Sequence, residues 1–218
     1  MRTKSVFSCA SCGYQSAKWL GRCPDCSSWN SFSEEDYVAP SSGEKSRVSL
    51  YKDGPVLLKD VLARDEDRLK THIRELDRVL GGGIVKGSVI LIGGDPGVGK
   101  STISLQVSNH LTAQGIRVLY VSGEESVAQT KLRAKRLGES GSDNLYIVNQ
   151  TDLSLIVEYI RKLKPQAVII DSIQVVFDSA ISSSPGSVSQ VRECAGILTQ
   201  LAKTTETSIF IIGHVTKE

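Results

Sequence analysis

The motif that most constrains this chain is Gly-x-x-x-x-Gly-Lys-Ser, which occupies residues 94–101. This pattern is typical of a phosphate-binding loop when a strand precedes it and a helix follows it. The preceding residues 88–93 are apolar and β-branched, and the following segment, Thr102–Gln114, places apolar residues four apart before Gly115. Because both flanking elements are predicted, we interpret the motif as a nucleotide site rather than as a glycine-rich turn that matches by chance.

The residue types of the motif explain what it can bind. Glycines let successive backbone N–H groups turn toward a phosphate, and the helix N-terminus adds partial positive charge. Lys100 is expected to reach the β- and γ-phosphates of ATP, and the Ser101 hydroxyl to ligate Mg²⁺. The predicted nucleotide-binding residues are Gly94, Asp95, Pro96, Gly97, Val98, Gly99, Lys100, Ser101, Thr102 and Asp171.

From about Thr71 onward, strand and helix patterns alternate, which predicts an α/β fold with a mainly parallel sheet and helices on both faces. The predicted strands are apolar throughout, as expected for strands buried on both sides. They are Val89–Gly93, Arg117–Ser122, Leu145–Val148, Ala167–Asp171 and Ser208–Gly213, and the predicted helices are Thr102–Gln114, Val127–Leu137, Asp152–Leu163 and Val188–Thr204.

Polar residues stand at the ends of three predicted strands, where ligands of parallel sheets gather. Asp171 is predicted to help hold Mg²⁺, although an ordinary turn-capping Asp would have the same pattern. Glu124 and Glu125 are candidates to activate the attacking water, with Glu124 preferred; the alternative places both in the first turn of a helix. His214 is a candidate γ-phosphate sensor, although a His at a strand end is more often an ordinary hydrogen-bonded residue. Lys100 completes the predicted catalytic set.

Two Cys-x-x-Cys pairs near the N-terminus predict a metal site. Cys9, Cys12, Cys23 and Cys26 supply four thiolates at a spacing that closes a tetrahedral structural site, for which Zn²⁺ is the preferred metal. A single iron ion would fit the same ligands, and two disulfides are the less favoured alternative. Cys194 stands apart on an apolar helix face and is predicted to be a buried core thiol.

Aromatic and basic residues lie within and just after the loop between the cysteine pairs. Lys18, Trp19 and Arg22 precede the second pair, and Trp29 follows it. Such residues together suit stacking on nucleic-acid bases. The alternative, which we favour for each tryptophan, is that both indoles pack the interior of this small module.

Composition is ordinary for a globular protein, with 40% hydrophobic and 23% charged residues, and the odd number of cysteines, four of them in two Cys-x-x-Cys pairs, fits a reduced, cytoplasmic setting. The sequence contains no run of 18 apolar residues, so no membrane span is predicted, and the N-terminus does not resemble a secretory signal. The formal net charge of +2 is too small to indicate nucleic-acid binding by itself. We expect a zinc module over residues 1–32, an acidic and Ser/Gly-rich linker over 33–70, and a nucleotide-binding domain over 71–218.

Several motifs together resemble the bacterial RadA (Sms) family, RecA-like ATPases of recombinational DNA repair. They are the four-cysteine module, the Leu-Asp-Arg-Val-Leu-Gly-Gly-Gly-Ile run at 76–84, the loop at 94–101, the Tyr-Val-Ser-Gly-Glu-Glu-Ser run at 120–126 and Gly-His-Val-Thr-Lys at 213–217. The resemblance implies a RecA-like P-loop NTPase preceded by a zinc module, with ATP, Mg²⁺ and Zn²⁺ as ligands.

The resemblance also implies an activity. Family members are DNA-dependent, helicase-type ATP hydrolases that form hexameric rings, move along single-stranded DNA and drive branch migration of recombination intermediates, with recombinase or replication proteins as further partners. The segment from Phe177 to Arg192 resembles a family loop that faces the ring centre. Two alternatives remain: a clock-like ATPase or autokinase, which the adjacent glutamates suggest, and a nucleotide-switched module that binds DNA or protein.

Relatives in this family continue beyond the point that corresponds to Glu218, into the rest of the ATPase core and a protease-like C-terminal domain. The resemblance therefore implies that the core over residues 71–218 is incomplete. Efficient turnover is expected to need residues and neighbouring subunits that these 218 residues do not supply.

Overall fold

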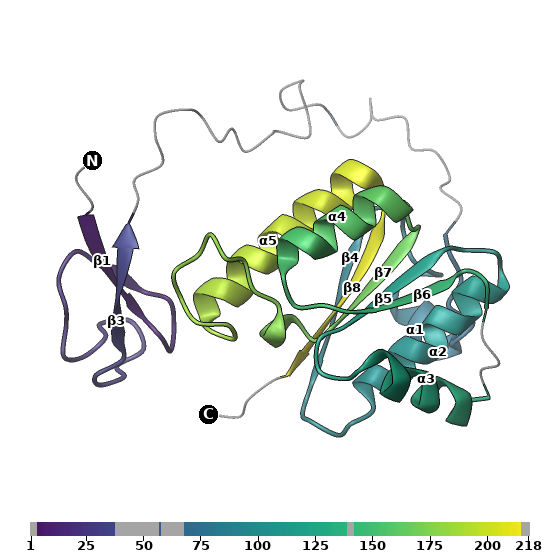
Figure 1. Ribbon diagram of the computed structural model, residues 1–218, viewed down its shortest axis with the longest axis horizontal. Coiled ribbons are helices and arrows are strands. Elements are labelled where there is room, and N and C mark those ends of the chain that lie inside the picture. Colours follow the sequence, from purple (N-terminus) through teal and green to yellow (C-terminus); the bar gives the residue numbers. More distant parts are fainter. Residues whose placement is uncertain (1–3, 38–56, 58–67, 139–141, 215–218) are drawn as a thin grey trace.

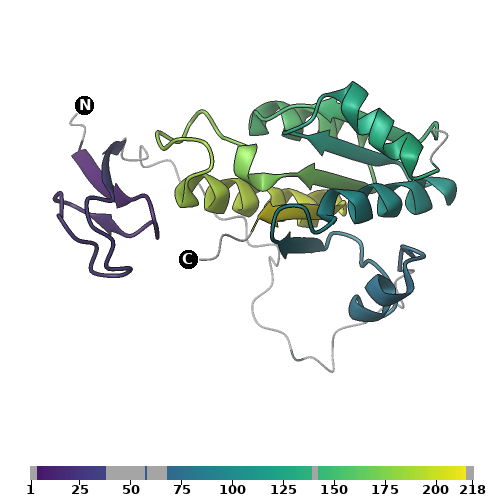
Figure 2. The ribbon, with the colours of Figure 1, turned by 90° about the horizontal axis from the view of Figure 1, so that it is seen from below.

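The computed structural model describes residues 4–37, 57, 68–138 and 142–214 (Figure 1). The first of these ranges forms a small antiparallel sheet of strand order β2-β1-β3, with β1 at Lys4–Cys9, β2 at Gln15–Ser16 and β3 at Phe32–Tyr37. Figure 2 shows this module from a second direction. Residues 33–36, Ser-Glu-Glu-Asp, belong to the linker that the sequence predicts, and in the structure they pair with β1. The linker residues 38–56 and 58–67 lie outside the described part of the chain.

The second unit is the predicted α/β domain. Its sheet is parallel throughout, with strand order β4-β8-β7-β5-β6. The strands are β4 (Val89–Gly94), β5 (Val118–Ser122), β6 (Leu145–Asn149), β7 (Ala167–Asp171) and β8 (Ser208–His214). The helices are α1 (Arg74–Val79), α2 (Lys100–Ala113), α3 (Val127–Arg136), α4 (Leu153–Leu163) and α5 (Val188–Thr205), with a 3₁₀ turn, η2, at Ile173–Val175. The predicted alternation is confirmed, with boundaries shifted by one or two residues.

Helices cover both faces of this sheet, as predicted (Figure 1). On one face, α4 and α5 pack against strand residues that include Val168 and Ile170. On the other face, α2 and the last turn of α3 pack against residues that include Tyr120 and Phe210. Every residue from Ala167 to Ile170 is buried, because β7 lies in the middle of the sheet. Cys194 on α5 is fully buried in the first of these cores, which confirms its prediction as a core thiol.

Local sequence explains where several helices begin. Ser126 and Gln129 form a capping box at α3, in which each side chain satisfies a backbone N–H of the other residue. Asp152 caps α4 and Ser187 caps α5, and in each case a side-chain oxygen accepts a bond from a first-turn N–H. In contrast, α2 begins after Gly99, which has no side chain that could cap the helix. The first turn of α2 therefore keeps N–H groups that a ligand can use.

The strand order places a topological switch point at the centre of the sheet. The connection from β4 to β5 runs through α2 on one face, and the connection from β7 to β8 runs through α5 on the other. The pairing register aligns Gly94 with His214, and Ser122 with Asp171, so these strand ends lie at one edge of the sheet. Ligands of open α/β sheets bind at such an edge. Among the described residues, no helix combines the length and apolarity that crossing a membrane requires.

Candidate functional site

The phosphate loop joins β4 to α2 in the predicted geometry. Gly97 and Gly99 adopt φ values of 81° and 97°, a region that side-chain-bearing residues rarely enter. The Lys100 side chain is buried, and its Nζ donates to the carbonyl oxygens of Gly94 and Asp95, each at 2.8 Å. The loop thus holds a buried ammonium group in its own concavity. This arrangement fits the phosphate group of a nucleotide.

A cavity of about 530 Å³ opens over this loop. Its walls are formed by the loop itself, one of the two adjacent glutamates, the histidine at the end of β8 and side chains from α3. Its lining comprises Pro96, Gly97, Gly99, Lys100, Ser101, Thr102, Glu124, Arg133, Arg136, Leu137 and His214. The structure therefore brings predicted residues from the loop after β4, the start of α2, the turn after β5 and the end of β8 into one cavity.

Glu124 is held at the cavity by two partners from other strand ends. Ser172, directly after β7, donates from Oγ to Glu124 Oε1 at 2.5 Å, and His214 Nε2 lies 3.2 Å from the same oxygen. The Ser172 hydrogen bond lowers the pKa of the Glu124 carboxyl, and the His214 contact lowers it further. Glu124 therefore remains an oriented carboxylate at neutral pH. Ser172 was not predicted; its position directly after a strand that ends in Asp171 is the signal that could have identified it.

Glu125 is directed differently from Glu124. Its carboxylate forms an ion pair with Arg133 of α3, and its backbone oxygen accepts hydrogen bonds from Ser122 Oγ at 2.7 Å and Asn149 Nδ2 at 3.0 Å. Glu125 does not line the phosphate-loop cavity. The two adjacent glutamates therefore differ in position, and the geometry favours Glu124 as the residue that faces a bound nucleotide.

Asp171 lies at the predicted strand end, beside the end of β5. Tyr120 donates from its hydroxyl to Asp171 Oδ2 at 2.5 Å. Burial, together with the neighbouring Asp171 charge, raises the pKa of Tyr120, so the phenol stays protonated and acts as a donor. Asp171 is not among the residues that line the cavity, so its predicted contact with Mg²⁺ stays a prediction.

Gly123 allows the backbone before Glu124 to approach Val175 of η2 closely. A Cβ atom at this position would lie 2.2 Å from Val175 Cγ2 in η2, a distance that no packing tolerates. The Gly123 N–H donates to the Asp171 carbonyl at 2.7 Å. Gln174, also in η2, donates from Nε2 to the His214 carbonyl at 3.2 Å. The turn after β7 thus packs directly beneath the Glu124 and His214 backbone, a role for Gln174 that the sequence does not reveal.

Two arginines of α3 were also missed. Arg133 and Arg136 line the phosphate-loop cavity, and with Glu125 they line a smaller neighbouring one. They add positive charge beside a loop that is predicted to bind an anion. Their spacing of three residues on a helix was visible in the sequence, but a basic last turn is also an ordinary helix-dipole feature.

The four predicted metal ligands converge in the N-terminal module. The sulfur atoms of Cys9, Cys12, Cys23 and Cys26 all lie within 4.8 Å of one another. Two cross pairs, Cys9–Cys26 and Cys12–Cys23, have Sγ–Sγ separations of 3.6 and 3.5 Å. A tetrahedral zinc ion with Zn–S bonds of about 2.3 Å requires sulfur separations near 3.8 Å, whereas a disulfide requires about 2 Å. The cluster fits zinc, and all four cysteines are free of disulfide bonds.

The backbone around each cysteine pair repeats. The N–H of Gly13 donates to the Cys9 carbonyl at 2.8 Å, and the N–H of Ser27 donates to the Cys23 carbonyl at 2.9 Å. Both Gly13 and Ser27 have positive φ, at 75° and 64°. These matched turns present two thiols each toward a common centre, as a structural zinc site requires.

The surroundings of Cys9 and Cys12 shift the pKa values of their thiols in opposite directions. Burial raises the pKa of the Cys9 thiol, but a hydrogen bond with the Ser31 side chain and backbone hydrogen bonds outweigh it and lower the pKa to about 6. Burial and the adjacent thiols raise the pKa of Cys12 to about 12. The Cys9 thiol is therefore favoured as a thiolate, which is the form of cysteine that a zinc ion would bind.

The prediction that both tryptophans pack inside this module is wrong. Trp19 is 53% exposed and Trp29 is 71% exposed. The buried cluster of the module instead contains Cys9, Cys23 and Phe32. With a metal centre as its interior, the module has no space for two indole rings.

Comparison with known proteins supports both units. Residues 55–218 match the family described as an AAA domain. This chain belongs to that family. Residues 7–34 match the family described as a rubredoxin metal binding domain, which agrees with the four-cysteine cluster.

Curated relatives of this AAA-domain chain carry the name DNA repair protein RadA. The protein from Bacillus subtilis (strain 168) is 50% identical over 222 residues, which cover 100% of this chain and 48% of the relative. The protein from Listeria monocytogenes serovar 1/2a is 51% identical over 216 residues, or 97% and 46% of the two chains. The one from Streptococcus pyogenes serotype M6 is 52% identical over 219 residues, or 100% and 48%. The resemblance to bacterial RadA is confirmed, and the chain spans about half the length of these relatives.

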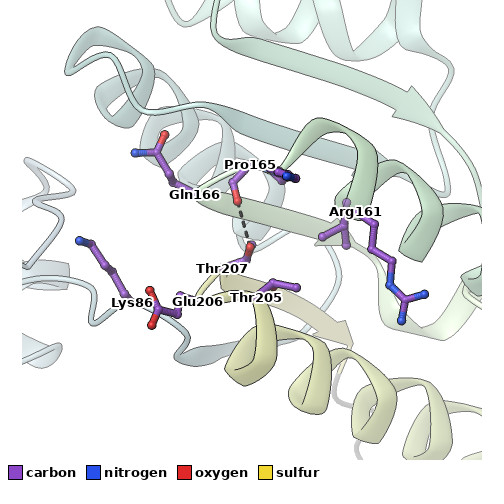
Figure 3. A pocket seen from close by; sticks show the side chains of 9 residues that line it. Lys86, Arg161, Pro165, Gln166, Thr205, Glu206 and Thr207 are labelled. Carbon is purple, nitrogen blue, oxygen red and sulfur yellow. Dashed lines mark hydrogen bonds between the residues drawn. The ribbon is translucent and has the colours of Figure 1, made fainter.

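Another cavity, of about 550 Å³, lies at the opposite edge of the sheet, before β7 and β8 begin. Lys86, Arg161 and Glu206 are among its lining residues, and Thr207 Oγ1 donates to the Pro165 carbonyl at 2.9 Å. Figure 3 shows the Lys86 and Arg161 side chains extending in opposite directions. None of the predicted site residues lines this cavity, and its cationic groups do not converge on a common point.

Proposed function

We propose that this chain carries the ATP-hydrolysing core of a DNA-repair motor. The observation that carries the proposal is that one cavity joins the phosphate loop to an oriented carboxylate, Glu124. The AAA-domain match and the names of the relatives support an ATPase that acts in DNA repair. We further propose that the whole protein is a helicase-type, DNA-dependent ATPase that works as a hexameric ring on single-stranded DNA and promotes branch migration.

The residues of the loop would hold the nucleotide. Lys100 would exchange its two carbonyl partners for phosphate oxygens, and the α2 N-terminus would supply further N–H donors. Ser101 and Asp171 would hold Mg²⁺, which neutralises developing charge during phosphoryl transfer. Arg133 and Arg136 are placed to add positive charge at the same cavity.

Glu124 would orient the attacking water. The hydrogen bond from Ser172 favours the carboxylate and lowers its pKa, which makes Glu124 a well-positioned but weak base. This property suits phosphoryl transfer, in which positioning and electrostatic stabilisation contribute more than early proton abstraction. His214 contacts the same carboxylate, so it is placed to respond to what Glu124 binds.

The contacts of His214 suggest how DNA would influence hydrolysis. Its backbone carbonyl accepts from Gln174, and η2 leads directly into the segment that begins at Phe177. That segment resembles the family loop that faces DNA. We therefore propose that DNA at this loop shifts η2, and with it the positions of His214 and Glu124.

The decisive experiment measures ATP turnover with and without single-stranded DNA at low salt. It uses this chain and a longer form with the length of the relatives. We expect DNA-stimulated hydrolysis in the longer form and its loss in Lys100→Ala, because the buried ammonium group is removed from the phosphate loop. Lys203→Ala, which alters an exposed lysine of α5, serves as the matched control and should retain turnover.

Three results would count against this proposal. Turnover that ignores DNA at low salt would exclude the motor, and turnover that survives Lys100→Ala would exclude the site. Phosphorylated Ser or Thr after incubation with labelled ATP would favour an autokinase instead. The pairing of Glu125 with Arg133 gives that alternative less support than the adjacent glutamates did in the sequence.

A further inference from the structure

The N-terminal module exposes both of its tryptophans. Trp19 and Trp29 are the two tryptophans of the whole chain, and 53% and 71% of their surfaces are exposed. A module of this size has few large apolar side chains to bury, yet its two largest lie outside the Cys9, Cys23 and Phe32 cluster. Placing indoles in water forfeits the favourable free energy of burying them, and it leaves both rings accessible to a ligand.

Trp29 is held in a preformed arrangement with Arg22. The two residues face each other in an antiparallel bridge, and the Arg22 guanidinium carbon lies 5.7 Å from the centre of the Trp29 ring. Arg22 Nε also donates to the Ser27 carbonyl at 3.2 Å, and the Asn30 N–H donates to the Gly21 carbonyl at 2.9 Å. These contacts hold the cation over the indole ring, so little conformational entropy is lost when a ligand binds.

Trp19 packs beside the same backbone segment. A Cβ atom at Gly21 would be 3.7 Å from Cη2 and Cζ3 of the Trp19 ring. Trp19 thus lies beside Gly21, and Trp29 lies opposite the next residue, Arg22, so one short segment and its bridge partner carry both exposed rings.

Charge around these rings is balanced but unevenly placed. Among the side chains described in the module, the cations are Lys18 and Arg22, and the anions are Asp25 and Glu34. Both cations belong to the segment that carries Trp19 and faces Trp29. A site that relied on charge alone would need more cations, whereas isolated ring faces with a cation beside them suit stacked bases and a neighbouring phosphate.

We infer that the zinc module is a contact site for single-stranded nucleic acid, in which Trp29 and Trp19 stack on bases and Arg22 and Lys18 neutralise phosphates. The inference rests on the proposed function, because it gives the module a second contact on the same DNA. A protein interface would favour an apolar centre depleted of charged residues, whereas the Trp29 ring has the Arg22 guanidinium over it. Two phosphate contacts predict a shallow salt dependence, with a slope of about −1.4 on a double logarithmic plot.

The location of the tryptophans supplies the test, because indole fluorescence reports on this module and on nothing else in the chain. In the zinc-loaded Trp19→Phe variant, Trp29 is the single indole. We expect saturable quenching of its emission by a thymidine oligonucleotide of about a dozen nucleotides, with the shallow salt dependence given above.

Matched variants assign the contact. In the Trp19→Phe background, Arg22→Ala should weaken the binding that quenching reports, whereas Asp25→Asn, which also alters one charge in the module, should not. Trp29→Ala should weaken oligonucleotide binding to the module on the order of tenfold, measured by Trp19 quenching. The zinc content of each variant confirms that its module remains folded.

Three outcomes would overturn the inference. Unchanged indole emission, while a labelled oligonucleotide still binds the chain by anisotropy, would overturn the module site and leave the proposed DNA motor intact. Oligonucleotide affinity that survives loss of both indoles, with binding to a protein partner lost instead, would make the module a protein-docking site. Absence of oligonucleotide binding to any part of the chain would remove both this inference and the DNA part of the proposed function.

Discussion

In the N-terminal module, the buried apolar cluster described by the structure consists of Phe32 and two of the four cysteines. The α/β domain instead buries two large clusters, one on each face of its sheet. A module with so little apolar interior depends on metal binding for its folding free energy, whereas the domain depends on packing. The difference also concerns aromatic residues: the domain buries Tyr120, and the module exposes both tryptophans.

The largest expected effect comes from removing the metal. Structural zinc contributes about 10–16 kcal/mol to such small modules, so a strong chelator or Cys23→Ser should unfold residues 4–37. Thiol-reactive dye would then label the freed module cysteines, while Cys194, which is fully buried in α5, should stay protected until the domain unfolds. Labelling of Cys194 together with the module cysteines would show that the two regions fold as one unit.

A smaller loss of stability, confined to the α/β domain, should follow from creating a cavity in its core. Ile170 is fully buried in β7, so Ile170→Ala should lower the free energy of unfolding by about 2–5 kcal/mol in a denaturant titration. Bound zinc should not change. Ile197→Ala on α5, where the side chain is 36% exposed, is the matched control and should cost much less. Zinc loss in Ile170→Ala would contradict the separation of the two regions.

The smallest of these effects is a shift in pH dependence. Ser172 is the main cause of the lowered pKa of Glu124, so the active carboxylate should persist as the pH falls below the usual range for a glutamate. In Ser172→Ala that pKa should rise, and the acid limb of the turnover profile should move to higher pH. Ser154→Ala removes a similar hydroxyl bond from Asp152 at 2.6 Å, away from the site, and should leave the limb in place. If the acid limb of the turnover profile does not shift in Ser172→Ala, protonation of Glu124 is not the cause of that limb.

Local patterns carried most of what the sequence predicted. The phosphate loop, the strand ends at Asp171 and His214, and the four metal ligands all depend on spacing within short segments. The sequence did not predict β3, because three of its six residues are acidic and only pairing with β1 makes them a strand. That pairing joins residues 23 to 33 positions apart in the chain, which short-range periodicity does not report.

The distinction between Glu124 and Glu125 required the tertiary structure. The residues are adjacent and have identical chemistry, but Ser172 holds one and Arg133 holds the other. Exposure of the tryptophans was missed for a related reason. Hydrophobic residues pack inward only where an interior exists, and a metal centre occupies the interior of this module.

The most direct test of the account compares ATP turnover in Glu124→Gln and Glu125→Gln, in a form long enough to hydrolyse ATP. We predict that Glu124→Gln lowers turnover by about 10²- to 10⁴-fold, with nucleotide affinity retained, because the residue that orients water is lost. Glu125→Gln, which breaks a partly exposed ion pair, should lower it by less than about tenfold. Equal losses in the two variants, or a larger loss in Glu125→Gln, would contradict the placement of Glu124 at the reacting water.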